Sequence, residues 1–109
     1  MSIRLPRAIE TYLQAENSGD VESLSACFAP DATVRDEART HRGLAAIKRW
    51  KAETRRKYQH TVEPLGVERN GERTVVRSRL SGNFPGSPIV LQFVFELDGD
   101  LITSLEIGP

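Results

Sequence analysis

Asp36 is the residue whose position in this chain most favours acid–base chemistry. It ends the segment FAPDATVRD, residues 28–36, in which residues 32–36 are predicted to form a short strand because Thr33 and Val34 favour extended structure. If a sheet wraps around this strand, the carboxyl group lies at the wall of an internal pocket. Apolar walls, for example Trp50 and Phe93, would raise its pKa and make it a better general base.

Two structural roles compete with catalysis for Asp36. The carboxylate could pair with a nearby arginine, for which Arg35, Arg39 and Arg42 are available, or it could cap the loop that follows the strand. Tyr12 leaves a similar choice open, because it lies on the apolar stripe of a predicted helix. Its hydroxyl could donate a hydrogen bond to a ligand, or it could be satisfied within the core.

The other reactive residue types do not form a recognisable site. His41 and His60 lie far apart without a third ligand at metal spacing, so no metal is expected. The chain has no Ser-His-Asp set, phosphate loop or nucleotide fingerprint, so no cofactor is expected either. Cys27, the one cysteine, is predicted to be a small buried residue. Arg77 and Arg79 could bind an acidic ligand, but their predicted outward face favours solvent or a dimer interface.

The composition favours one small domain that spans residues 1–109. Lys+Arg and Asp+Glu both number 15, and this neutral balance argues against a dedicated nucleic-acid binder. Hydrophobic residues make up 39%, which fits an ordinary domain, a hollow one, or a subunit that hides surface against a partner. No signal peptide and no apolar run of about 20 residues is recognised, so we expect a cytoplasmic protein without a membrane partner.

Three amphipathic helices are predicted in the first half of the chain. The first has an apolar stripe at helical spacing: Leu5, Ala8, Ile9, Tyr12 and Leu13. A short second helix follows Asp20, carries Val21, Leu24 and Phe28, and ends before Pro30. The third begins at Gly43 and packs through Leu44, Ile47 and Trp50. Its opposite side is predicted to face solvent: Lys48, Arg49, Lys51, Arg55, Arg56 and Lys57.

From His60 onward the apolar residues alternate, which predicts antiparallel strands. Asn70-Gly71 is a strong hairpin signal and would pair Leu65 with Val76 and Val67 with Thr74. That register places Val62 and His60 on the outer face of the sheet.

Residues 82–88 are too rich in glycine and proline for a strand and are predicted to form a loop. After them, alternate residues of one strand share the core face: Ile89, Leu91, Phe93, Phe95 and Leu97. A three-residue turn over residues 98–100 would add Leu105 and Ile107 to this face. It would also turn Ile102 and Glu106 outward, which avoids burying a charge.

The order of these elements, the FAPDATVRD segment, and Arg42-Gly43 followed by Ile47 and Trp50 resemble the SnoaL-like group of the nuclear transport factor 2-like superfamily. The resemblance covers the whole chain. It implies an α+β fold, cystatin-like or cone-shaped, in which three N-terminal helices pack in the concave face of a strongly curved, mainly antiparallel sheet.

Within that superfamily, the segment is similar to that of ketosteroid isomerase. The resemblance implies that Asp36 takes the place of the proton-shuttling base and Tyr12 that of a hydrogen-bond donor to the enolate. The isomerase's second donor falls at about Phe93, and its supporting tyrosines fall at about Phe28 and Lys51. Because most polar partners are replaced, ketosteroid isomerase activity itself is not expected.

The resemblance leaves two functions open. The first is a small-molecule-binding cone with an apolar pocket near Asp36. The second is a cofactor-independent isomerase, cyclase or hydrolase that acts on a small apolar carbonyl or polyketide-like substrate. In both, the expected ligand-binding residues are Trp50, Phe93, Phe28, Leu91, Phe95 and Leu105. Both imply a homodimer through the outer sheet face, which Val62, Val75, Val90 and Val94 would support.

Overall fold

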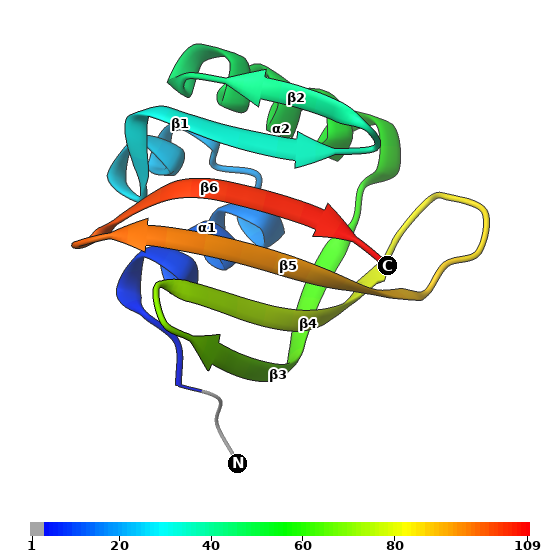
Figure 1. Ribbon diagram of the computed structural model, residues 1–109. Coiled ribbons are helices and arrows are strands. Elements are labelled where there is room, and N and C mark those ends of the chain that lie inside the picture. Colours follow the sequence, from blue (N-terminus) through cyan, green and yellow to red (C-terminus); the bar gives the residue numbers. More distant parts are fainter. Residues whose placement is uncertain (1–3) are drawn as a thin grey trace.

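The computed structural model describes residues 4–109, which form a six-stranded sheet with its helices on one face (Figure 1). In chain order, the helical elements α1 (Arg7–Ser18) and the 3-10 helix η1 (Val21–Ala26) are followed by strands β1 (Phe28–Asp36) and β2 (Arg39–Arg42). Helix α2 (Leu44–Tyr58) comes next. Strands β3 (Thr61–Asn70), β4 (Arg73–Ser81), β5 (Ile89–Asp98) and β6 (Leu101–Gly108) complete the chain.

The strand order is β2-β1-β6-β5-β4-β3. All neighbours are antiparallel except β1 and β6, which run parallel and place Val34 beside Leu105. The last strand of the chain therefore lies beside the first, and Asp36 ends β1, the second strand from one edge of the sheet. The predicted α+β fold is confirmed.

Helix α1 packs through the stripe that its sequence predicts. Ile9 and Tyr12 are fully buried, and the helix ends at Gly19, whose φ of +80° suits glycine. Tyr12 lies at the centre of an aromatic cluster, with ring centroids 5.8 Å from Phe28 and 5.5 Å from Phe95. These aromatic residues form the solid part of the core between α1 and the sheet.

The predicted second helix is shorter than expected. The 3-10 helix η1 ends at Ala26, and Phe28 and Pro30 belong to strand β1 instead. Cys27, which lies between η1 and β1, is buried, as predicted. Residues 39–42, expected in a polar loop, pair with β1 as strand β2, so the sheet has one strand more than the sequence indicated.

Two irregularities in strand pairing overturn part of the predicted register. Asn70 pairs with Arg73, so the hairpin turn lies one residue later than predicted and Val67 pairs with Val76 instead of Thr74. Strand β3 then shifts between Pro64 and Gly66, so Val62 pairs with Leu80 on the inner face. The outward prediction for Val62 and His60 is therefore wrong, and both are buried. An extra residue in one strand moves the side chains beyond it to the opposite face.

The second irregularity lies between β5 and β6. Asp98 pairs with Leu101 across a tighter turn than predicted, and the register then shifts after Glu96. The two changes compensate: Leu105 still pairs with Phe95, and Ile107 with Phe93, as the core pattern requires. Ile102 is fully buried, so its predicted outward orientation is wrong.

Gly82 allows the chain to pass closely over the end of α2. A Cβ atom at this position would lie 2.7 Å from the carbonyl oxygen of Tyr58 and 2.9 Å from the Cα of His60. Only glycine fits this approach without moving backbone. It fixes the start of the loop that follows β4 against the end of α2, where one rim of the site described below is formed.

Candidate functional site

A cavity of about 370 Å³ opens between α2 and the inner face of the sheet. Its apolar wall comes from the last strands and the loop after β4: Leu80, Phe84, Pro85, Ile89, Leu91, Phe93 and Ile107. Its polar and aromatic wall comes from α1, β1 and α2 with the residues next to them: Glu16, Asp36, Glu37, Trp50, Lys51, Thr54, Tyr58 and His60.

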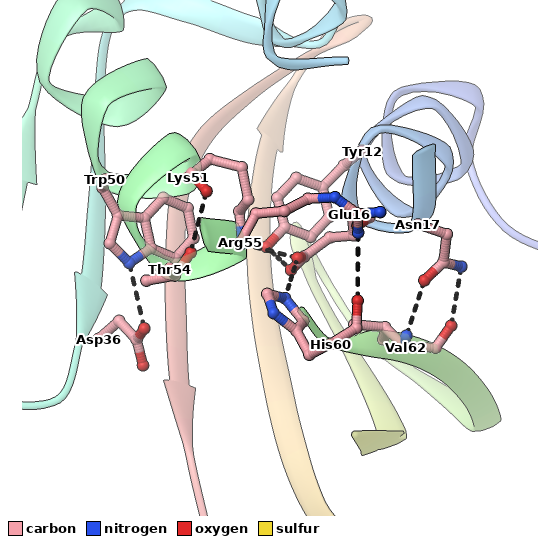
Figure 2. Close-up of polar contacts among 10 residues, drawn as sticks. All are labelled: Tyr12, Glu16, Asn17, Asp36, Trp50, Lys51, Thr54, Arg55, His60 and Val62. Atoms are coloured by element: carbon pink, nitrogen blue, oxygen red, sulfur yellow. Dashed lines mark hydrogen bonds and ion pairs between the residues drawn. The ribbon is translucent and has the colours of Figure 1, made fainter. Parts of the chain in front are cut away.

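Asp36 lies on the wall of this cavity, where the sequence placed it. The indole Nε1–H of Trp50 donates a hydrogen bond of 3.1 Å to its carboxylate (Figure 2). Desolvation by burial raises the pKa of Asp36, with a further contribution from the charge of Glu37; the Trp50 hydrogen bond and the Lys51 ammonium oppose the increase. The structure gives Asp36 a tryptophan as its hydrogen-bond partner, and Arg35 instead lies 4.0 Å from Glu106.

A buried polar cluster lies across the cavity from Asp36, centred on the carboxylate of Glu16. The Lys51 ammonium and the His60 Nε2 atom each lie 2.7 Å from Glu16 Oε1, and the Tyr12 hydroxyl donates to Oε2 (Figure 2). The side chains of Glu16 and Lys51 are only 1% and 2% exposed. We refer to Glu16, Lys51, His60 and Tyr12 as the Glu16 cluster.

The Glu16 cluster keeps its carboxylate ionised. Burial alone would raise the pKa of Glu16, but the Lys51 ammonium and the His60 hydrogen bond outweigh burial and lower the pKa to about 2. Burial and the charge of Glu16 raise the pKa of Tyr12 well above its ordinary value. Tyr12 is therefore a hydrogen-bond donor to Glu16.

Lys51 is in a different place from the one predicted. It was expected on the solvated side of its helix, yet its ammonium lies 3.9 Å from the centroid of the Trp50 ring and is paired with Glu16. The prediction is wrong because charge alone was taken to indicate exposure. Lys51 follows Ile47 by one helical turn, and this spacing is the signal that could have indicated burial.

The structure divides the predicted ligand-binding residues into two groups. Trp50, Phe93 and Leu91 line the cavity. Phe28, Phe95 and Leu105 are buried in the core and do not belong to the cavity wall. The predicted donor Tyr12 is also absent from that wall, because Glu16 lies between its hydroxyl and the open space.

Sequence reasoning missed Glu16, Lys51 and His60 as site residues. Glu16 and His60 are 44 residues apart, and their contact depends on the end of α1 meeting the start of β3. Asn17 secures that meeting through two hydrogen bonds with the backbone of Val62, and Arg55 adds hydrogen bonds to the carbonyl oxygens of Glu16 and His60. Among residues 4–109, no group of three or more His, Cys, Asp or Glu side chains could hold a metal ion.

The rim of the cavity is aromatic. Tyr58, at the end of α2, packs edge-to-face against Phe84 of the loop after β4, with ring centroids 5.8 Å apart. Its hydroxyl donates to Glu37 on the opposite side. Access to Asp36 is thus bounded by side chains of α2, the β1–β2 turn and residues 82–88.

An α+β cone whose helices and sheet enclose a small cavity, with Asp36 on its wall beside Trp50, defines the class of protein. The sequence model of the SnoaL-like domain matches residues 9–105, and the chain belongs to that family. The resemblance inferred from the FAPDATVRD segment is confirmed.

Solved structures with the same fold support this assignment. The chain is 39% identical to a candidate polyketide cyclase from Sinorhizobium meliloti, over 94% of both chains, with a TM-score of 0.91. A Catenulispora acidiphila protein with a ketosteroid isomerase-like fold, crystallised with trimethylamine, is 23% identical over 97% of this chain and 87% of its own (TM-score 0.84). A nuclear transport factor 2-like protein from Cytophaga hutchinsonii is 14% identical over 98% and 90% (TM-score 0.78). No curated protein sequence matches the chain.

Removing the Lys51 charge is expected to destabilise the fold strongly. Lys51→Met leaves the Glu16 carboxylate buried without its cation, which costs about 3–5 kcal/mol in comparable buried pairs. Lys48→Met is the matched control, because Lys48 pairs with Glu22 at 3.0 Å on the exposed side of the same helix, where such pairs contribute at most about 1 kcal/mol. Urea unfolding of both variants measures the difference; equal losses would contradict the role of the buried pair.

The Glu16 cluster also predicts how stability depends on pH. Because the pKa of Glu16 is lowered from 4.5 to about 2, its contribution is complete above pH 4.5 and is lost as the pH falls toward 2. Urea unfolding between pH 2 and pH 7 should therefore show a smaller acid-dependent loss in Glu16→Gln than in the wild type. An unchanged pH dependence would show that Glu16 is not the group responsible.

Proposed function

We propose that this chain binds a small, largely apolar molecule with a polar group inside the cavity that Asp36 lines. The observation that carries the proposal is the hollow itself, bounded by apolar side chains on the sheet and by a few polar groups opposite. Its volume of about 370 Å³ lies within the range of small-molecule sites. A few polar groups in a mostly apolar wall are what orients such a ligand.

Filling the cavity should abolish binding. In Leu91→Trp the larger side chain occupies part of the space next to Phe93, so affinity for apolar ketones such as 1-tetralone should fall more than about tenfold. Val67→Trp is the control, because Val67 is 37% exposed and outside the cavity wall. Isothermal titration calorimetry of the two variants and the wild type gives the affinities. Binding that survives Leu91→Trp unchanged would place the ligand elsewhere, and no ketone binding to the wild type would contradict the proposal.

Acid–base catalysis on a carbonyl compound is the second candidate function. The specific observation in its favour is the environment of Asp36, whose pKa is raised by burial while a Trp50 hydrogen bond holds one carboxylate oxygen. In this mechanism Asp36 removes a proton from the carbon next to a carbonyl group and returns it to the product. The 39% identity to a candidate polyketide cyclase suits a polyketide-like substrate.

Proton exchange tests this candidate without knowledge of the natural substrate. In D₂O the wild type should speed deuterium uptake at the carbon next to the carbonyl of 1-tetralone, followed by proton NMR. Asp36→Asn should lower the catalysed rate by about 100-fold or more, since a positioned base contributes 10²–10⁴-fold. Asp31→Asn, an exposed acid on the same strand, is the control. Equal catalysed exchange by Asp36→Asn and the wild type would remove Asp36 from the mechanism.

We also propose a homodimer through the outer face of the sheet. Val75 and Val94 are paired neighbours on that face, and Val90, 45% exposed, lies further along β5 beside Arg79. Val62, which was expected to contribute, faces the interior instead. Partly exposed valines on adjacent strands are the kind of surface that a second copy would cover.

A charge on this face should separate the subunits. Val90→Glu is expected to convert a dimer into a monomer in sedimentation velocity, because the contact would then have to bury a charged side chain. Val67→Glu, a substitution of similar exposure on the inner side of β3, should leave the assembly unchanged. A monomeric wild type would contradict the proposal directly.

A further inference from the structure

His60 has one ring nitrogen that the Glu16 cluster does not use. Its Nε2 lies 2.7 Å from Glu16 Oε1, whereas Nδ1 is buried and has no hydrogen-bond partner among residues 4–109. The side chain is only 6% exposed, and His60 is part of the cavity wall. Buried polar atoms in folded proteins are nearly always paired, so an unpaired nitrogen beside a ligand-sized cavity needs a partner.

The contact with Glu16 determines which ring nitrogen of His60 carries the hydrogen. An ionised carboxylate can only accept hydrogen bonds, so the nitrogen that faces it, Nε2, must be the protonated one. The negative charge of Glu16 is already balanced by Lys51 at 2.7 Å, so the ring lies beside a neutral ion pair. With the proton on Nε2, Nδ1 is the ring nitrogen that presents a lone pair.

We propose that Nδ1 of His60 is the hydrogen-bond acceptor that recognises a hydroxyl group of the ligand, and that Glu16 fixes its orientation. The inference rests on the proposed binding function and narrows its ligand class to small, mostly apolar molecules with a hydroxyl group, such as phenols, enols or alcohols. A ligand hydroxyl would pair the buried nitrogen, whereas a hydrocarbon of the same shape would leave it unpaired.

The neighbouring polar groups do not duplicate this role. The Lys51 ammonium is a donor, held between Glu16 and the face of the Trp50 ring. The Tyr12 hydroxyl is committed to Glu16 and lies outside the cavity wall. Asp36 is the competing acceptor on the opposite wall, and the experiment therefore has to separate it from His60.

The test uses p-cresol and p-xylene, which share one ring and differ only by a hydroxyl in place of a methyl group. Isothermal titration calorimetry gives the ratio of their affinities for each protein. In His60→Gln the side-chain amide can still donate to Glu16, but the imidazole nitrogen is lost and the remaining acceptor is an amide oxygen on a flexible chain, which no ring holds in place. The ratio that favours p-cresol should fall about three- to tenfold in this variant, the size of one lost hydrogen bond.

Leu91→Ala and Asp36→Asn are the matched controls. Leu91→Ala enlarges the cavity and should weaken both probes without changing their ratio. Asp36→Asn should also preserve the ratio. A ratio that falls in Asp36→Asn and stays constant in His60→Gln would overturn the inference, because the carboxylate of Asp36 would then be the group that accepts the hydrogen bond from the ligand hydroxyl.

Nitrogen-15 NMR of the histidine ring gives a second readout that does not depend on affinity. In the free protein, His60 should be protonated on Nε2 and unprotonated at Nδ1. Addition of p-cresol should shift the Nδ1 resonance, whereas addition of p-xylene should not. A ring protonated at Nδ1 would overturn the inference even if both probes bind. If neither probe binds the wild type, the proposed binding function and this inference fail together; if both bind and the ratio is unchanged in His60→Gln, only the inference fails.

Discussion

The burial of the Glu16 carboxylate is the constraint on which the rest of the structure depends. A carboxylate that is 1% exposed is tolerated only when cations and hydrogen-bond donors surround it. Here they come from three separate parts of the chain: Tyr12 from α1 itself, Lys51 from α2, and His60 from the connection just before β3. The cluster therefore fixes the relative positions of both helices and the sheet around a space that side chains do not fill.

The two carboxylates of the cavity have opposite environments and therefore opposite properties. Glu16 is surrounded by donors and keeps its charge, with a pKa of about 2. Asp36 has one donor, Trp50, and burial raises its pKa. Where the pKa values of two acids in one site are shifted in opposite directions, the acid with the raised pKa is suited to exchanging a proton. The acid with the lowered pKa is suited to holding a constant charge. The structure thus gives different acid–base properties to two residues that look equivalent in composition.

The fold was predictable from the sequence because several local signals agreed. The apolar stripe of the first helix, Gly43 before the third, and the acid at the end of residues 28–36 all correspond to what the structure shows. Asp36, Trp50, Leu91 and Phe93 were placed near the cavity for the same reason. These features depend on periodicity and on short segments, which a single sequence records directly.

The Glu16 cluster and the strand irregularities could not be predicted in the same way. Glu16, Lys51 and His60 are charged or polar, and each in isolation is typical of a solvated position. Their burial is stable only because they meet one another, and that meeting depends on tertiary structure. The register shift in β3 has a local signal in Pro64 and Gly66, residue types that mark bulges within strands, but its effect on the faces of the strand was not inferred. Together with the shift in β6, it turns Val62 and Ile102 inward.

The loop over residues 82–88 has a consequence for how proteins with this architecture diversify. It supplies Phe84 and Pro85 to the cavity wall but contributes no residue to the Glu16 cluster. Its contacts with the end of α2 come from Gly82, from the Asn83 N–H that donates to the Tyr58 carbonyl oxygen, and from Phe84. Changes in length or composition within the loop would alter which molecules enter while the interior charges remain in place. The entrance of the cavity can therefore change through this loop without any change to the residues that hold the buried carboxylate.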